Sequence, residues 1–290
     1  MDELRRTVRE AVSWAERELA AAGVDAPRLS AELLAGRAFG LSRLGLITHH
    51  TDTPAPGSMD TFYALVARRA AGEPAAYILG EREFFGLDFR VTPDVLIPRP
   101  ETEGIVEEAQ RLFLADTPLV FADFGTGSGA LAVTLAHEFP AARGLAVDIS
   151  EQALAVASGN ARANGVAERL DFVRADFTTL ELPAASLDLL VSNPPYVTES
   201  EYAMLSPEVR DFEPALALVS PEEGLAHIRG LLPVAVRALR PGGVLLCELG
   251  CGQGPAALAL TSESGPGLCN VTILKDYAGL DRILKAFRAD

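Results

Sequence analysis

The sequence has little cysteine and histidine, and it contains no long uninterrupted hydrophobic run. Its three cysteines, Cys247, Cys251 and Cys269, are too few and too poorly placed to form a disulfide framework. Its four histidines lack the spacing of metal ligands. No stretch of 18 or more residues is continuously apolar, and residues 1–6 lack the apolar centre of a signal peptide. We therefore expect no metal site, no membrane association and a reducing, cytoplasmic location.

Positive charge is also scarce. The 290 residues include 25 lysines and arginines against 40 acidic residues, which gives a formal net charge of −15. Proteins bind nucleic acid largely by neutralising phosphates with basic side chains, so this balance disfavours direct nucleic-acid binding. Residues 1–100 carry 12 basic and 14 acidic side chains, whereas residues 101–290 carry 13 and 26. This uneven charge predicts two parts with different tasks.

Residues 1–75 show the periodicity of a small helical bundle. The predicted inward faces hold Leu4, Val8, Val12, Ala15 and Leu19 in the first helix, Leu29, Leu33, Leu34 and Ala38 in the second, and Phe62, Leu65 and Val66 in the third. Trp14 is expected to pack within this bundle. Residues 77–79 and 87–91 then predict a pair of strands, and Pro98 and Pro100 keep the following segment extended.

From about residue 101 onward, strand and helix patterns alternate. The predicted strands are residues 119–124, 144–148, 170–174, 187–192, 244–249 and 271–274, and the predicted helices are residues 130–138, 151–164, 226–239 and 255–261. Apolar strands that alternate with helices predict an α/β fold, with a mostly parallel sheet covered on both faces.

A glycine-rich loop follows the first of these strands and opens a helix. Glycine allows a sharp turn and a close backbone approach to a ligand, and the start of a helix offers free N–H donors. Such a loop alone is also consistent with an ordinary strand-to-helix turn. As a ligand site it would use Asp123, Gly125, Thr126, Gly127, Ser128 and Gly129.

Two further positions favour a nucleoside ligand. Asp148, followed by Ile149, ends the second strand, where a carboxylate can accept hydrogen bonds from both ribose hydroxyls. The alternative role for Asp148, a helix cap, is available to Ser150 instead. Asp176 and Phe177 follow the third strand, where they could contact the amine and the face of an adenine ring.

The Gly-x-Gly-x-Gly spacing differs from the Gly-x-Gly-x-x-Gly spacing of NAD-binding loops. With Asp148, it resembles the class I S-adenosylmethionine-dependent methyltransferases over roughly residues 101–290. The resemblance implies a Rossmann-like sheet of seven strands, one of them antiparallel. It also implies that Asp123 lies beside the ammonium group of the cofactor.

The sequence Asn193-Pro194-Pro195-Tyr196 follows an apolar strand. It could be an ordinary turn, but two prolines also form a rigid wall without N–H donors. The Asn193 side-chain oxygen and the Pro194 carbonyl supply two acceptors, which is what an NH₂ group on a conjugated system requires. The tetrapeptide resembles the signature of methyltransferases that act on amide or exocyclic amine nitrogens. No lysine or histidine general base is evident, and none is needed before methyl transfer.

Segments outside this core resemble the peptide chain release factor glutamine methyltransferases over almost the whole chain. They include Leu96-Ile97-Pro98-Arg99-Pro100-Glu101, Glu248-Leu249-Gly250, Gln253-Gly254 and Lys275-Asp276-Tyr277. The resemblance implies a small all-α recognition domain (1–75), a β-hairpin linker (76–100) and a catalytic domain (101–290). It implies methylation of the glutamine in the Gly-Gly-Gln loop of class 1 release factors, with Arg99 beside the substrate. Whether Arg99 and Glu101 act on substrate or only join domains stays open.

Two departures and three alternatives accompany this interpretation. Phe177 stands where some relatives carry tryptophan, and residues 265–269 form an unusual loop. A ribosomal-protein glutamine methyltransferase would share the tetrapeptide. A DNA or RNA adenine-amine methyltransferase would be expected to carry a basic face, which residues 1–75 lack. A non-catalytic binding module would leave the amine-binding tetrapeptide unexplained.

Overall fold

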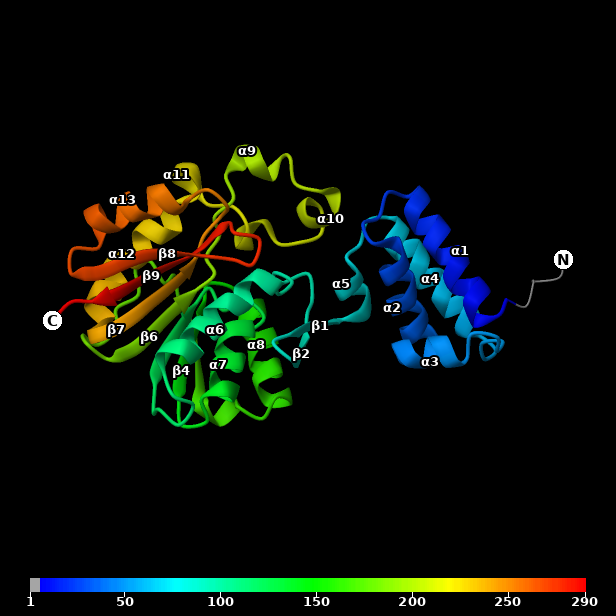
Figure 1. Cartoon of the computed structure of the whole chain (residues 1–290), viewed down its shortest axis with the longest axis horizontal. Helices are drawn as coiled ribbons and strands as arrows, with labels where there is room; N and C mark the ends of the chain where they lie inside the picture. The colour runs from blue at the N-terminus through cyan, green and yellow to red at the C-terminus, as the bar shows by residue number, and fades with distance from the viewer. Residues whose placement is uncertain (1–5) are drawn as a thin grey trace. The chain divides into compact units, whose positions relative to one another are not determined.

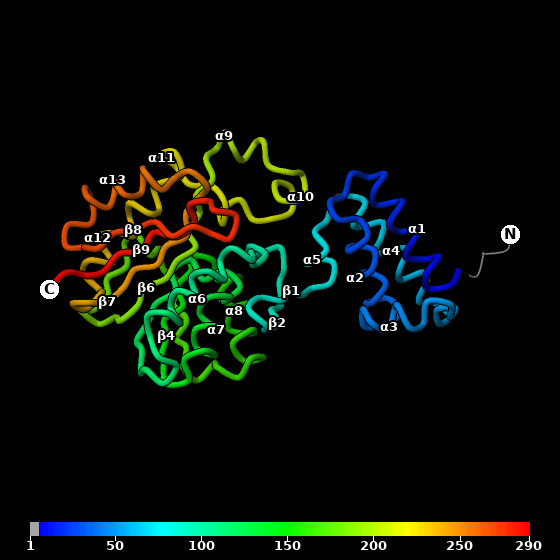
Figure 2. The backbone as a smooth tube through the Cα atoms, in the orientation of Figure 1, coloured from blue at the N-terminus to red at the C-terminus, as the bar shows by residue number. Residues whose placement is uncertain are grey.

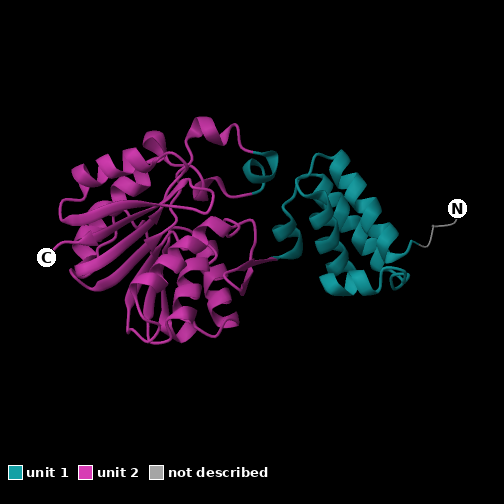
Figure 3. Cartoon of the chain, viewed as in Figure 1, with its two compact units in different colours: residues 1–80, 206–212 teal, residues 81–205, 213–290 magenta. Residues whose placement is uncertain are grey.

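The computed structural model describes residues 6–290, which divide into two compact units (Figure 3). The helical unit comprises the chain up to Gly80 together with Ser206–Phe212, and the sheet unit comprises Glu81–Leu205 and Glu213–Asp290. Leu4, expected on an inner helix face, lies outside the described residues. Within residues 6–290, no helix has the length and apolarity to cross a membrane, and no three or more potential metal ligands form a group.

Helices dominate the helical unit, as the periodicity predicts. They are α1 (Val8–Ala21), α2 (Pro27–Phe39), α3 (Arg43–Thr48), α4 (Ser58–Ala70), α5 (Ala75–Leu79) and the short α10 (Pro207–Arg210). Thr7 and Glu10 form a capping box that fixes the start of α1. Trp14 packs edge-on against Tyr63, with ring centroids 4.8 Å apart, which confirms its packing role.

The expected inner face of α2 is partly wrong. Leu29 and Leu33 are each 44% exposed, whereas Ala31, Leu34 and Ala35 are buried. Only one stripe of a surface helix can face the core. In α2 this stripe is formed by Ala31, Leu34 and Ala35, which are spaced by three and four positions.

The predicted hairpin begins later than expected. Residues 77–79 are not a strand but belong to α5, which Gly80 ends in the left-handed region at φ +74°. The observed strands are β1 (Glu81–Phe84) and β2 (Leu87–Arg90), paired antiparallel. Phe85 and Gly86 both have positive φ, as tight two-residue hairpin turns require.

The sheet unit contains the seven-stranded sheet that the methyltransferase resemblance implies. The strands are β3 (Val120–Phe124), β4 (Arg143–Asp148), β5 (Leu170–Arg174), β6 (Leu187–Ser192), β7 (Leu239–Glu248), β8 (Leu268–Lys275) and β9 (Asp281–Arg288). Their order is β5-β4-β3-β6-β7-β9-β8. Only β9 runs opposite to its neighbours, since β7 and β8 both pair with it antiparallel. The expected fold class is confirmed.

Helices cover both faces of this sheet (Figures 1 and 2). One core layer joins it to α6 (Glu103–Leu112), α7 (Ala130–Glu138) and α8 (Glu151–Ala163), and the other joins it to α12 (Ala226–Ala238) and α13 (Gly254–Ser264). The shorter elements are η1 (Pro100–Thr102), η2 (Ala167–Arg169), α9 (Glu199–Tyr202), η3 (Ala215–Ala217) and α11 (Pro221–Gly224). The sequence analysis did not predict α6 or β9.

The sheet topology decides where a ligand can bind. The chain proceeds from β3 outward through β4 to β5, and then returns to place β6 on the other side of β3. Strand order therefore reverses at β3, and ligands of open α/β sheets bind beside the carboxyl ends at such a point.

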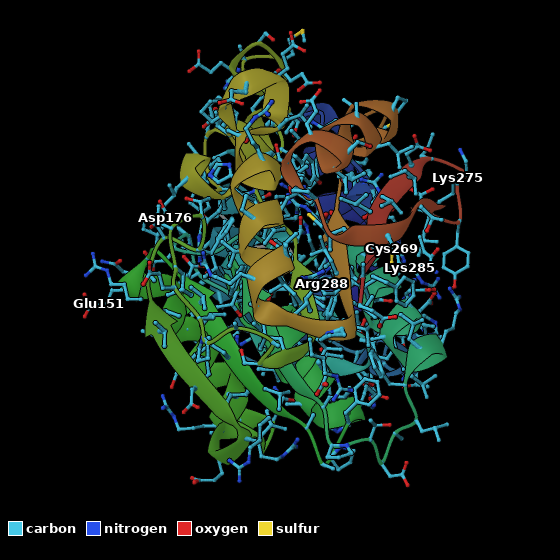
Figure 4. All side chains as sticks on the ribbon, turned by 90° about the vertical axis from the view of Figure 1, so that its left-hand side faces the viewer. Glu151, Asp176, Cys269, Lys275, Lys285 and Arg288 are labelled. Carbon is cyan, nitrogen blue, oxygen red and sulfur yellow. The ribbon has the colours of Figure 1, made fainter. Side chains whose placement is uncertain are left out.

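Glu151 and Asp176 lie on one side of the view in Figure 4, and Cys269, Lys275 and Lys285 lie on the other. Cys247 is fully buried in β7.

Candidate active site

A cavity of about 350 Å³ lies in the sheet unit at the carboxyl ends of β3, β4 and β6. Most of the sequence-predicted site residues line it, namely Arg99, Asp123, Gly125, Thr126, Gly127, Ser128, Asp148, Ile149, Asp176, Phe177, Asn193 and Pro195. Gly129, Pro194 and Tyr196 are not part of its lining. The fold thus brings together segments that are far apart in the sequence.

The glycine-rich loop forms one wall of this cavity. Gly125, Gly127 and Gly129 have φ values of +72°, +54° and +82°, a region that favours glycine. A Cβ at Gly125 would approach Phe177 and the Asn193 carbonyl, both cavity residues. A Cβ at Gly129 would instead lie 3.1 Å from that of Ala157 in α8. Gly129 therefore allows α7 to pack closely on α8 and does not face the cavity.

Asp123 is the most deeply buried acid of the cavity, at 1% exposed. Its Oδ2 accepts hydrogen bonds from Thr126 Oγ1 over 2.6 Å and from the Ala132 N–H over 3.1 Å. Its Oδ1 is buried without a hydrogen-bond partner in the described chain. Burial raises the pKa of Asp123 to about 7. An unpaired buried carboxylate oxygen fits a cationic ligand group, such as the ammonium that the methyltransferase resemblance places here.

Asp148, at the end of β4, is hydrogen-bonded to the loops that follow β3 and β4. Its Oδ2 accepts from the Gly127 N–H and its Oδ1 from the Ser150 N–H, each over 2.9 Å. Ser150 caps α8 by accepting from the Ala153 N–H, so Asp148 is not needed for that role. Burial is the main cause that raises the pKa of Asp148. A carboxylate oxygen can accept more than one hydrogen bond, so Asp148 keeps capacity for ribose hydroxyls.

Asp176 and Phe177 line the cavity next to His227. The Phe177 ring stacks on Phe124, with centroids 5.6 Å apart and planes 18° apart. The His227 ring lies 6.1 Å from that of Phe177, and its Nδ1 is 2.8 Å from Ser220 Oγ. Burial lowers the pKa of His227, which favours neutral imidazole. Sequence reasoning missed this histidine because α12 reaches the cavity only through the fold.

Asn193 lies at the end of β6, where its side chain joins a buried hydrogen-bond chain. Its Nδ2 donates to Thr102 Oγ1 over 3.0 Å, and Thr102 Oγ1 donates to Glu248 Oε2 over 2.6 Å. The Tyr196 hydroxyl donates to the other oxygen of Glu248 over 3.3 Å. Tyr196 thus contacts a residue behind the cavity wall.

The Tyr196 main chain is also fixed. Gln253 Nε2 donates to the Tyr196 carbonyl over 3.1 Å, and Gln253 Oε1 accepts from the Gly250 N–H over 2.9 Å. Gly224 is required nearby, because an added Cβ would lie 2.2 Å from the Tyr196 carbonyl oxygen. Gln253 therefore supports the tetrapeptide.

Arg99 lines the cavity and has a buried partner. Its guanidinium donates to Glu213 Oε1, and Glu213 Oε2 accepts from the Ile97 N–H over 3.2 Å. Glu213 is 4% exposed, so this pair holds the extended segment before η1 in place. Glu101 is exposed and absent from the cavity lining.

Thr102 and Leu216 are further cavity residues that the sequence analysis did not identify. Glu248 belongs to the Glu248-Leu249-Gly250 motif, but nothing in the sequence connects it to Asn193. Thr102 and Glu248 are 146 positions apart, and no local sequence pattern predicts the hydrogen bond between them.

Comparisons with known proteins find matches in both units of the chain. The family model described as the PrmC N-terminal domain matches residues 10–80, and the model described as a methyltransferase domain matches residues 121–212. The methyltransferase from Pyrococcus furiosus, a solved structure, aligns with a TM-score of 0.52 at 22% identity, over 77% of this chain and 98% of that one. This likeness supports the fold.

Two curated relatives match nearly the full chain. The release factor glutamine methyltransferase of Nitratidesulfovibrio vulgaris is 50% identical over 97% of this chain and 95% of its own length. The release factor glutamine methyltransferase of Moorella thermoacetica is 45% identical over 98% of this chain and 99% of its own length.

Proposed function

Because the chain belongs to the release factor glutamine methyltransferase family, we propose that it methylates the side-chain amide nitrogen of a release factor glutamine. The observation that carries this proposal is the Asn193 side chain, which lines the cavity while its Nδ2 is held by Thr102. That leaves an amide oxygen as acceptor in the same cavity that holds the unpaired oxygen of Asp123.

The methyl donor is S-adenosylmethionine, the cofactor that the motifs imply. Asp123 would bind its ammonium group, Asp148 its ribose hydroxyls, and Phe177 and Asp176 its adenine. Ile149, 49% exposed at the cavity, would add an apolar contact to the ring. Gly125, Thr126, Gly127 and Ser128 would border the cofactor with their main chain.

The amide substrate would be held by acceptors alone. Asn193 Oδ1 and the Pro194 carbonyl would each accept one N–H of the target amide. Pro195, which lines the cavity, would limit its movement. Tyr196 does not line the cavity, so the predicted contact between its aromatic face and the substrate stays a prediction. Arg99, fixed by Glu213, would border the substrate loop.

Positioning is the main requirement of the reaction, because the lone pair of an amide nitrogen is delocalised. The cofactor, when bound, would supply a sulfonium methyl group for transfer to the amide nitrogen, with the sulfur as the leaving group. The tetrapeptide aligns the nitrogen with that methyl group, which lowers the entropic part of the barrier. The nitrogen becomes cationic and then releases a proton to solvent, so no side chain need act as a base beforehand.

The division of tasks follows the sequence expectation. We assign substrate recognition to residues 1–75, the connection to residues 76–100, and cofactor binding and chemistry to residues 101–290. The substrate glutamine is assigned to the Gly-Gly-Gln loop of class 1 release factors. A cytoplasmic setting and recognition without direct nucleic-acid contact complete the proposal, consistent with the net charge of −15.

A labelled-methyl assay tests this function. The purified protein is incubated with methyl-labelled S-adenosylmethionine and either a class 1 release factor, the same factor with its Gly-Gly-Gln glutamine replaced by alanine, ribosomal protein, or DNA. Label is expected on the intact release factor alone. Label on the alanine variant would refute the assigned glutamine, and exclusive labelling of ribosomal protein or DNA would refute the substrate class.

A further inference from the structure

Two buried residues lie behind Asn193 and contact it or each other. Thr102 of η1 is 4% exposed, and Glu248 at the end of β7 is 1% exposed. Asn193 Nδ2 donates to Thr102 Oγ1, and Thr102 Oγ1 in turn donates to Glu248 Oε2. Three segments separated by 91 and 146 positions thus form one hydrogen-bond chain from the cavity inward.

The direction of this chain follows from the number of hydrogens. A threonine hydroxyl has one hydrogen to donate, and an ionised carboxylate can only accept. While the Thr102 hydroxyl donates its hydrogen to the ionised Glu248 carboxylate, Thr102 can only accept from Asn193. The NH₂ group of the Asn193 amide must then face Thr102, which turns Oδ1 away from it. Within residues 6–290, no hydrogen bond to Asn193 Oδ1 is present.

We propose that Thr102 and Glu248 are positioning residues that hold the Asn193 amide in the one orientation that presents Oδ1 to the substrate. This inference rests on the proposed function, since it assumes an amide NH₂ as the group to be bound. In the reverse orientation Asn193 would present its own NH₂ to the substrate NH₂, donor against donor. One of the two acceptors that align the nitrogen would then be lost.

The environment of Glu248 makes this orientation depend on pH. The Tyr196 hydroxyl, the Thr102 hydroxyl and the positive charge of Arg282 in β9 favour the ionised carboxylate, and Glu101 and burial oppose it. Cys247, its neighbour in β7, stays a neutral thiol because burial raises its pKa. The net result is a pKa of about 7 for Glu248, with burial as the main cause.

Protonation removes the fixed direction. A protonated Glu248 can donate to Thr102, and Thr102 can then either accept from the Asn193 NH₂ group or donate to Asn193 Oδ1. The Asn193 amide is consequently free to turn over, so methyl transfer is expected to slow as the pH falls through about 7. When the cofactor is saturating, Asp123 is engaged by its ligand. The loss of kcat at low pH should then reflect protonation of Glu248.

The first test compares Thr102→Val with Thr102→Ser in the full-length protein. Valine keeps the shape but not the hydroxyl, so kcat on release factor should fall about 10-fold to 100-fold, the usual loss when a residue that orients a functional ligand is removed. S-adenosylmethionine affinity should stay within about twofold, and serine should restore most of kcat. Thr134→Val is the matched control, because the buried Thr134 hydroxyl of α7 has no hydrogen-bond partner.

The second test is the pH profile of kcat at saturating cofactor, for the natural protein and for Glu248→Gln. The natural protein should lose activity as pH falls through about 7, and the glutamine variant should lack this limb. A Thr102→Val kcat equal to that of the natural protein overturns the inference. The inference is also overturned if kcat of Glu248→Gln falls through pH 7 as it does in the natural protein. This second result tests the inference even if the valine variant does not fold. Failure of the natural protein to methylate any release factor would instead overturn the proposed function.

Discussion

The Gly127 N–H donates to Asp148 Oδ2 over 2.9 Å, so the glycine-rich loop after β3 is bound directly to the carboxylate that ends β4. Asp148 consequently helps to shape the loop, in addition to the ribose-binding role proposed for it. The two segments of the proposed cofactor site are therefore coupled.

Replacement of Asp148 by alanine is expected to weaken S-adenosylmethionine binding by about 1.5–3 kcal/mol, the range of hydrogen bonds to charged groups. That corresponds to about a 10-fold to 150-fold higher Kd. Titration calorimetry measures it. Asp171→Ala, at an exposed position of the neighbouring strand β5, is the control and should leave the Kd unchanged. Unchanged affinity in a folded Asp148→Ala protein would remove Asp148 from the site.

Replacement of Asn193 by alanine should lower kcat by about 10²–10³, as for other preorganised hydrogen-bonding groups. Cofactor affinity should hardly change, because Asn193 is assigned to the amide substrate. Steady-state kinetics with release factor, together with calorimetry for the cofactor, separates these effects. A parallel loss of cofactor affinity would reassign Asn193 to cofactor binding.

Cofactor affinity should fall with acidification through about pH 7, because burial raises the pKa of Asp123 to about 7 in the free protein. A protonated Asp123 cannot offer a full negative charge to the ammonium group, so binding at lower pH must release one proton. Calorimetry in buffers of different ionisation enthalpy counts that proton. Asp123→Asn should bind more weakly and release none, and an equal proton release would exclude Asp123 as its source.

The same shift has a defined sign for stability. Between about pH 4 and pH 7 the folded protein keeps a proton on Asp123 that the unfolded chain has lost, so this group lowers the free energy of unfolding as pH rises. Asp123→Asn should flatten that part of the stability profile in denaturant titrations. A profile identical to that of the natural protein would show that Asp123 titrates normally.

Removal of the helical segment tests the division of tasks. A shortened chain that begins at Glu81 retains β1 and β2, which belong to the sheet unit, and all proposed cofactor residues. It should bind S-adenosylmethionine with unchanged affinity. Its KM for release factor should rise strongly with a smaller change in kcat, because the lost contacts contribute uniform binding energy. An unchanged kcat/KM would exclude residues 1–80 as the recognition element.

Gly144 in β4 tests the packing beneath the site. A Cβ there would lie 2.3 Å from Phe121 Cζ and 2.7 Å from Leu170 Cδ2, so Gly144→Ala should destabilise the protein by about 1–3 kcal/mol, the usual range for overpacking. Gly159→Ala in α8 is the control, because its Cβ would meet no atom within 4 Å, and it should stabilise the helix. Chemical denaturation compares both, and equal stabilities would contradict the packing argument.

Much of the fold follows from local sequence alone. The limits of α7, β5 and β6 match the expectation, because each is a short apolar or amphipathic run with clear ends. The residues at 77–79 mislead, since such a short segment takes its state from its surroundings, here α5. The sequence analysis did not predict strand β9, because its charged and apolar residues do not alternate strictly. Its strand conformation depends instead on pairing with β7 and β8.

The sequence by itself determined the glycine-rich loop, the position of Asp148 and the Asn-Pro-Pro-Tyr tetrapeptide, because each is a contiguous segment whose chemistry can be interpreted locally. Only the tertiary structure decided that Thr102 and Glu248 hold Asn193, that His227 reaches the Phe177 ring, and that Gly129 serves helix packing. These contacts join residues far apart in the chain, and their distance and direction arise only when η1, β6, β7 and α12 meet at the carboxyl edge of the sheet.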